Sequence, residues 1–145
     1  MENAGVPEPS AQMRPLDRLV GKWKISGGTQ GECSYEWMDG GHFLIQRGTV
    51  TMPGGGETTW MQVIGFERGM DGQSGELPVG RLFTTAGDTL TYVSESNGDD
   101  ITIWFGEKGS PAYYKGRFSE DGNTLAGEWI MPGDGGYEET MERMS

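Results

Sequence analysis

The chain has 145 residues, the length of one domain with a real core, and carries 22 acidic side chains against 11 Lys and Arg, a formal net charge of -11. This charge argues against nucleic acid and membranes as partners, because nucleic acid and anionic lipid both need a basic face. Cys33 is the only cysteine, which excludes an intrachain disulfide and, with no signal peptide recognisable, favours the cytoplasm. The 26 glycines accompany five Trp, five Tyr and five Phe, so they indicate many turns in a folded chain rather than disorder.

Residues 1–12 contain two prolines and little that is apolar, and we expect them to form a flexible arm. Residues 13–145 are predicted to form a single domain. It begins with one or two helical turns at 13–20, where Pro15 suits a first helical position. The remainder consists of short β-branched and aromatic runs separated by turn signals, which predict ten strands: 21–27, 31–38, 42–51, 58–67, 79–85, 88–95, 100–106, 112–119, 123–131 and 136–144.

Short connections between these strands predict antiparallel neighbours in chain order. Five connections contain Asp-Gly or Asn-Gly, dipeptides that tolerate the positive φ of tight hairpin turns. Ten strands rarely stay as one open sheet, and an even number lets the last strand pair antiparallel with the first. We therefore predict an all-β, ten-stranded antiparallel up-and-down barrel with residues 13–20 plugging one end. A Greek-key sandwich is the alternative, but it needs a long connection, and only 68–78 is long.

Alternation of apolar and polar side chains indicates which face of several strands points inward. Cys33, Tyr35 and Trp37 are inward in one strand, and Tyr137 and Met141 in the last. Strands 42–51 and 58–67 are apolar on both faces, so their phase stays open: either His42 and Gln46 or Arg47 would point inward. The expected interior is mainly aromatic: Trp23, Tyr35, Trp37, Trp60, Tyr92, Tyr114, Trp129 and Tyr137.

An interior of this kind predicts a cavity for an apolar or aromatic molecule, oriented by a few polar groups. Glu139 shares the inward phase of its strand, and desolvation there should raise its pKa; an inward Arg47 would be its natural partner. The candidate ligand-binding residues are Tyr35, Trp37, Gln46, Arg47, Trp60, Gln62, Phe105, Trp129, Met131 and Tyr137. The candidate catalytic residues are Glu139, Tyr92, Tyr114 and His42.

Other chemistries find little support in the residues. His42 is the only histidine and Cys33 the only thiol, so a zinc site is not expected, and no Gly-x-Ser-x-Gly elbow is present. A Cys33 nucleophile would need His42 as its base. The loops "MPGGGE" at 52–57 and "MPGDGG" at 131–136 lack the Gly-Lys-Ser/Thr ending of a phosphate loop. Both fall at the end opposite the plug, so we expect them to gate the mouth of the barrel, with Met52 and Met131 on its rim.

Several segments together resemble a known family. The run "LDRLVGKW" at 16–23 looks like the start of calycin-type barrels, where a short helix leads into a Gly-x-Trp strand and closes the barrel floor. The segments "GGHFLIQRG" at 40–48, "IGFE" at 64–67 and "RFSEDGNTLAGEW" at 117–129 resemble bacterial lipocalin-like domains of unknown function, relatives of fatty-acid-binding and nitrobindin-type barrels. The resemblance implies a meander barrel of about ten strands that often binds a small ligand.

The family's nitrobindin branch binds haem through a histidine near the C-terminus, and no histidine follows residue 130 here, so we expect no cofactor. Three functional hypotheses follow. The first is a binding barrel for a small hydrophobic molecule. The second is a cyclase or isomerase of secondary metabolism, acting by preorganising a substrate in the same cavity; this rests on the analogy with calycin-like cyclases. The third is an interaction module in which Trp104 and Tyr113 form a homodimer interface.

Overall fold

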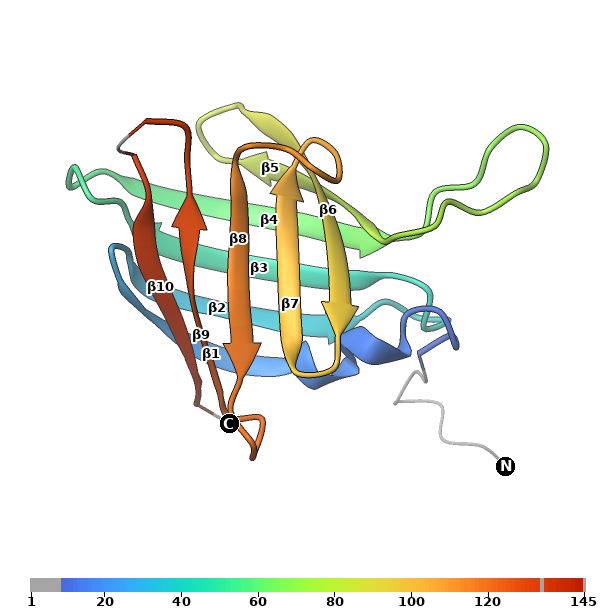
Figure 1. The fold of residues 1–145 in the computed structure, drawn as a ribbon, viewed down its shortest axis with the longest axis horizontal. Coiled ribbons are helices and arrows are strands. Elements are labelled where there is room, and N and C mark those ends of the chain that lie inside the picture. Colours follow the sequence, from blue (N-terminus) through green and yellow to red (C-terminus); the bar gives the residue numbers. More distant parts are fainter. Residues whose placement is uncertain (1–8, 134, 145) are drawn as a thin grey trace.

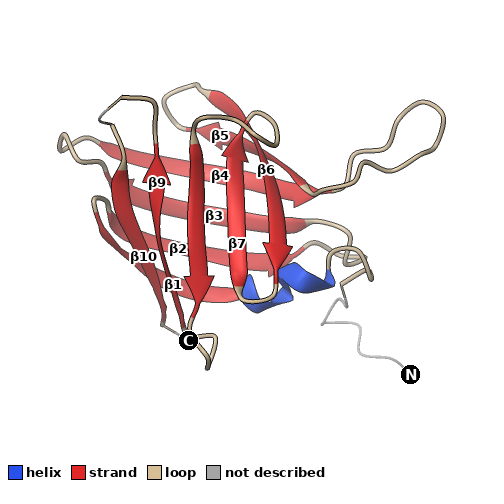
Figure 2. Ribbon diagram, in the orientation of Figure 1, coloured by secondary structure: helices blue, strands red, loops and turns tan. Residues whose placement is uncertain are grey.

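The computed structural model describes residues 9–133 and 135–144. It shows one closed antiparallel barrel of ten strands, preceded by a single short helix (Figures 1 and 2). The predicted all-β meander is therefore confirmed, and the architecture is consistent with a calycin-like barrel. The predicted arm at 1–12 lies mostly outside the described residues; within it, the Ser10 N–H donates to the Gly41 carbonyl at 2.8 Å.

The helix η1, Arg14–Leu19, is a 3-10 helix. The ten strands are β1 Gly21–Gly27, β2 Gln30–Trp37, β3 Leu44–Thr51, β4 Glu57–Gly65, β5 Val79–Thr84, β6 Thr89–Asn97, β7 Asp100–Phe105, β8 Tyr113–Phe118, β9 Thr124–Ile130 and β10 Tyr137–Arg143. Each pairs antiparallel with its neighbour in the chain, and β10 closes the barrel on β1, with Ile25 opposite Met141. In Figure 1, β1–β4 run across the picture while β6–β10 run up and down in front of them.

Tight turns form where the sequence places glycine after Asn or Asp. Between β6 and β7 the chain reverses through Gly98, whose φ is 64°, and between β8 and β9 through Gly122, whose φ is 75°. Glycine adopts this left-handed backbone region with the least strain, which explains its place in these dipeptides. The Asp134–Gly135 turn includes residue 134, which is outside the described residues.

Gly31 has a different role, because it allows two strands to approach closely. A Cβ at this position would overlap the carbonyl oxygen of Thr49 on β3, the strand that pairs with β2. The glycine is therefore required by the close backbone contact between the two strands rather than by its φ angle.

The helix η1 plugs one end of the barrel, as predicted. Pro15 lies in its first turn, and Met13, Leu16 and Leu19 are buried at 1%, 3% and 4% exposure. The indole N–H of Trp23, a fully buried residue, donates to the Leu19 carbonyl at 2.8 Å. The Arg143 guanidinium lies 4.3 Å from the centre of the Trp23 ring and ties the end of β10 to the plug.

Strands that alternate clearly have the predicted orientation. Cys33 and Tyr35 are buried on β2, Tyr114 and Phe118 on β8, and Leu125 on β9. Among residues 9–133 and 135–144, no helix is long and apolar enough to cross a lipid bilayer.

Candidate functional site

A cavity of about 330 Å³ lies inside the barrel. Leu16 and Leu19 of the plug line it at one end. Its exposed lining residues, Met52 and Asp88, belong to the opposite end, where the loops after β1, β3, β5, β7 and β9 gather (Figure 1). The mouth is therefore at the end that carries the two Met-Pro-Gly loops, as the turn alternation predicts. Met52 is on the rim; Met131 is half-buried and does not line the cavity.

One wall of the cavity combines aromatic rings with a carboxylate. Glu139 of β10 and Trp129 of β9 both line this wall. Trp129 lies directly opposite Tyr137 in the β9–β10 pair. The Glu139 Oε1 atom accepts hydrogen bonds from the Trp129 indole N–H and from the Thr29 hydroxyl, each at 3.4 Å. The Tyr114 hydroxyl donates to the backbone carbonyl of Glu139 at 3.3 Å. The predicted inward orientation of Glu139 is thus confirmed.

The surroundings of Glu139 disfavour charge. Burial raises the pKa of its carboxyl above the ordinary range, and the hydrogen bonds from Trp129 and Thr29 offset this only in part. The pKa values of two nearby phenols are raised as well. Burial is the larger cause and the Glu139 carboxylate the smaller one, and together they raise the pKa of Tyr137 to about 12 and also raise that of Tyr92. A negative charge on any one of these groups is therefore costly inside the cavity.

The rings on this wall pack against one another. The Trp129 ring centre lies 5.4 Å from that of Tyr114 and 6.0 Å from that of Tyr92. The Tyr92 ring meets Phe105 edge-on with centres 5.6 Å apart. Phe105 is 43% exposed and is not part of the cavity lining, so it supports Tyr92 from the mouth end of β7. Such pairs restrict the rotation of the rings that face the cavity.

A second polar cluster lies on β2–β4. Gln46 is 7% exposed and donates through Nε2 to the Tyr35 hydroxyl at 3.0 Å. Its Oε1 accepts from the Trp60 indole N–H at 2.9 Å and from the Gln62 amide at 2.6 Å. All four side chains line the cavity. The strand phase that the sequence leaves open is thereby decided: the even-numbered positions of β3 and β4 face inward.

Five predicted site residues do not line the cavity: Phe105 and Met131, described above, and Arg47, His42 and Trp37. Arg47 points outward on β3, where its Nη1 lies 2.9 Å from Glu36 Oε1, so its predicted place in the binding site is wrong and it is not the partner of Glu139. His42 is exposed in the loop between β2 and β3 rather than in a strand. Trp37 donates from its indole N–H to Asp17 at 2.8 Å, so it fastens β2 to the plug and does not line the cavity.

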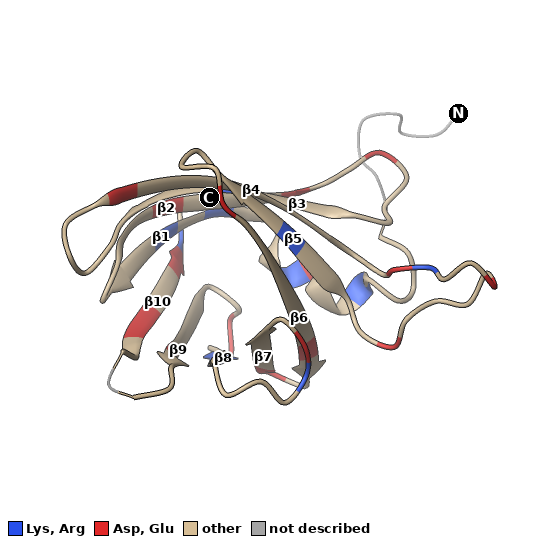
Figure 3. Ribbon diagram, turned by 90° about the horizontal axis from the view of Figure 1, so that it is seen from above, with Lys and Arg blue, Asp and Glu red and all other residues tan. Residues whose placement is uncertain are grey.

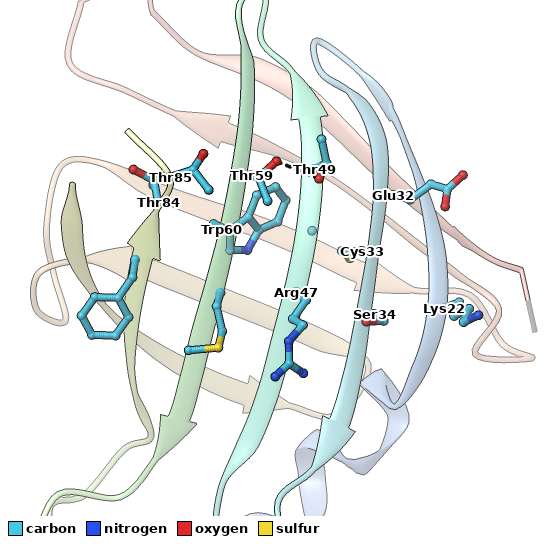
Figure 4. A pocket seen from close by; sticks show the side chains of 13 residues that line it. Lys22, Glu32, Cys33, Ser34, Arg47, Thr49, Thr59, Trp60, Thr84 and Thr85 are labelled. Atoms are coloured by element: carbon cyan, nitrogen blue, oxygen red, sulfur yellow. Dashed lines mark hydrogen bonds between the residues drawn. The ribbon is translucent and has the colours of Figure 1, made fainter. Parts of the chain in front are cut away.

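The outer face of β1–β5 carries an open groove, seen from close by in Figure 4. Arg47 lies in the middle of this groove. Ser34 lies opposite it on β2, and Thr49 lies two residues further along β3. Successive residues of β3 alternate between the two faces of the sheet, and Gln46 faces the cavity. The Arg47 side chain therefore extends into solvent on the outer face.

Cys33 is a core residue. It is 4% exposed, its thiol lies 3.7 Å from the Met141 sulfur, and burial raises the pKa of the thiol to about 12. A thiol in this state stays protonated at neutral pH and is a poor nucleophile. The pairing with His42 as a base has no support in the structure, since His42 is exposed.

Two lining residues that lie in turns between strands are not predicted from the sequence. Thr29 lies in the turn between β1 and β2 and reaches Glu139; Asp88 lies in the turn between β5 and β6 and lines the mouth. Both occur in short polar turns, where alternation within strands carries no information about direction. No group of three or more His, Cys, Asp or Glu side chains that could hold a metal ion occurs in the part of the chain that the structure describes.

Comparison with models of protein families and with curated proteins finds no match for this chain.

Proposed function

We propose that the protein binds a small hydrophobic or aromatic molecule inside the barrel. The observation that carries this proposal is the cavity of about 330 Å³, plugged by η1 at one end and reached past Met52 and Asp88 at the other. Small-molecule sites are typically concave and mostly apolar, with a few convergent polar groups that fix orientation. The Glu139 and Gln46 clusters supply such groups on two walls, and a cavity at the small end of the usual range suits a ligand of one or two rings.

Tryptophan fluorescence tests the proposal, because Trp60 and Trp129 line the cavity. A panel of apolar aromatic molecules should quench or shift the emission in a saturable way and raise the melting temperature. Trp129→Phe should remove much of the signal. Trp104→Phe is the matched control, since Trp104 lies on the other face of β7 from the cavity residues Ile101 and Ile103. Loss of the signal in the control alone would contradict binding inside the barrel.

A second pair of variants tests occupancy without a spectroscopic probe. Ser94 lines the cavity from β6, while Thr91 points to the outer face of the same strand. Ser94→Phe should fill part of the cavity and reduce affinity at least tenfold, whereas Thr91→Phe should leave it unchanged. Equal affinities in both variants would place the ligand outside the cavity.

An enzymatic role is the alternative, as a cyclase or isomerase. The observation that favours it is Glu139, a carboxyl with a raised pKa in an aromatic cavity, as a general acid or base requires. Conversion of a bound molecule that stops in Glu139→Gln, with binding retained, would support catalysis. Binding without any conversion across the panel would leave the barrel as a carrier. The genes that surround this one offer a source of candidate substrates.

The remaining expectations belong to the same proposal. We propose a distant relationship to lipocalin-like domains, supported by the short helix η1 that leads into Gly21 and Trp23 and closes the barrel floor. A homodimer would use Trp104 and Tyr113, which are direct neighbours across β7 and β8. Sedimentation of the protein and of Trp104→Ser would test it; a monomer at all concentrations would remove the dimer. Cytoplasmic localisation stays a prediction.

A further inference from the structure

We propose that the molecule bound in the cavity is an organic cation: an apolar or aromatic body that carries a protonated amine, with its ammonium group between Glu139 and the surrounding aromatic rings. This inference rests on the proposed binding function and adds the chemical class of the ligand.

The charged groups of the cavity wall favour a cation. The described residues that line the cavity include two carboxylates, Glu139 and Asp88, and no Lys, Arg or His. The arginines of β3 and β5 point away from the cavity. Arg47 pairs with Glu36 and Arg81 with Glu67 on the outer surface. An anionic ligand such as a fatty acid would meet two carboxyl groups here and no counterion.

The carboxylate of Glu139 is incompletely coordinated. A carboxylate can accept about four hydrogen bonds. Glu139 accepts two, both on Oε1 and both long at 3.4 Å, while Oε2 accepts none from residues 9–133 and 135–144. A half-buried carboxylate that is poorly coordinated is stabilised by a cation that reaches it. An ammonium group brings both the charge and up to three N–H donors.

Aromatic rings surround the Glu139 carboxylate. Trp129 donates to Glu139 and packs against Tyr114 and Tyr92, at centre distances of 5.4 and 6.0 Å, and Tyr137 is its cross-strand neighbour. These rings and the carboxylate line the same part of the cavity. Cations bind the faces of aromatic rings within about 6 Å of the ring centre, most strongly that of Trp. A neutral ligand would use the rings but would leave the carboxylate unpaired.

The entrance has the same sign as the interior. Asp88 is exposed at the mouth, and Glu107 lies in the loop between β7 and β8 at that end. Lys108, in the same loop, pairs with Glu95 at 3.2 Å on the outer side of β6. Figure 3 shows acidic segments along β10 as well. With a net charge of -11, the protein attracts cations to the mouth over a distance of about a Debye length.

Three molecules that share one apolar body and differ in the head group test the inference: 4-phenylbutylamine, 4-phenylbutan-1-ol and 4-phenylbutanoate. Binding to the full chain is measured by isothermal titration calorimetry at pH 7.5. The amine should bind at least tenfold more tightly than the alcohol, and the carboxylate more weakly than the alcohol.

Two variants locate the effect. Glu139→Gln keeps the shape and removes the charge, so the amine preference should fall below about threefold while alcohol affinity is retained. Glu138→Gln removes the same charge from the exposed face of the same strand, and the tenfold preference should survive there. This control separates pairing inside the cavity from attraction by the overall charge. If Glu139→Gln does not fold, the relative affinities of the three molecules for the unaltered protein still test whether the cavity prefers a cation.

Each outcome decides between the two proposals. If the alcohol or the carboxylate binds as tightly as the amine, the cation inference is overturned and the binding function stands. If the amine preference persists in Glu139→Gln, the overall charge produces it and the inference is again overturned. If none of the three binds up to millimolar concentration, and the wider aromatic panel also leaves the fluorescence unchanged, the binding function itself is refuted.

Discussion

Arg143 joins the last strand of the barrel to its plug, and its substitution should destabilise the whole fold. Its Nη1 donates to the Val20 carbonyl at 2.6 Å and its Nη2 to the Arg18 carbonyl at 2.7 Å. Its guanidinium also stacks over Trp23 at 4.3 Å. Arg143→Met keeps most of the aliphatic stem and removes the donors, so the variant isolates these interactions from simple loss of packing.

The magnitude follows from the contacts. A hydrogen bond to a charged group contributes about 1.5–3 kcal/mol, and the half-buried site of Arg143 places its two short bonds at the lower end, roughly 3 kcal/mol together. The cation–π contact over Trp23 adds about 1 kcal/mol. Because interactions of one side chain are not additive, the expected loss is about 3–4 kcal/mol.

Urea unfolding followed by tryptophan fluorescence measures this loss. With a slope of about 2 kcal/mol per molar, the midpoint should fall by about 1.5–2 M. The control is Arg117→Met, which removes an exposed arginine that pairs with Asp100 at 2.9 Å on the outer face; such pairs contribute about 0–1 kcal/mol. If both variants lose the same free energy, or if Arg143→Met loses less than about 1 kcal/mol, the plug is not held in the way described.

Three further predictions concern single residues. Glu139→Gln should raise the free energy of unfolding, relative to the unaltered protein, by more at pH 8 than at pH 4. The pKa of Glu139 is raised in the folded state, so the stability that its neutral form contributes at pH 4 is lost as the pH rises through that pKa. Urea unfolding at the two pH values measures this, and an equal difference at both would show that the carboxyl is not desolvated. The Cys33 thiol, buried with a pKa of about 12, should react with a disulfide reagent at pH 8 about a hundredfold more slowly in the native protein than in urea; fast native reaction would show that the site opens. Gly31→Ala should destabilise the fold by about 1–3 kcal/mol or more because its Cβ meets the Thr49 carbonyl, whereas Gly54→Ala, in open space, should change stability by less than about 0.5 kcal/mol; thermal unfolding compares the pair, and similar melting temperatures would contradict the close strand contact.

Much of the barrel is predictable because local chemistry specifies it. Aromatic and β-branched runs separated by Asx-Gly turns determine the number and order of the strands, and the even strand count allows closure of β10 on β1. The inward direction is predictable where one face of a strand is polar, as around Tyr35, Tyr114 and Glu139. The inward carboxylate in the aromatic wall is therefore predictable before any coordinates are known.

The phase of β3 and β4 is not predictable in the same way. Both faces of these strands carry apolar residues. A register shift of one residue would place Arg47 in the cavity instead of Gln46. Pairing decides the matter: Gln46 lies opposite Tyr35 on one side and Gln62 on the other, and the three amide and phenol groups satisfy one another inside. The polar cluster is a product of three strands, so no one strand contains the signal for it.

The sequence by itself thus determined the elements, their order and the faces of the strands that alternate clearly, because these depend on residues close together in the chain. Only the tertiary structure decided which distant groups meet. It joined Thr29 to Glu139, attached Trp37 to the plug through Asp17, and turned Arg47 to the outside. These contacts depend on strand register and on turn direction, which are set by closure of the whole barrel and not by any local pattern.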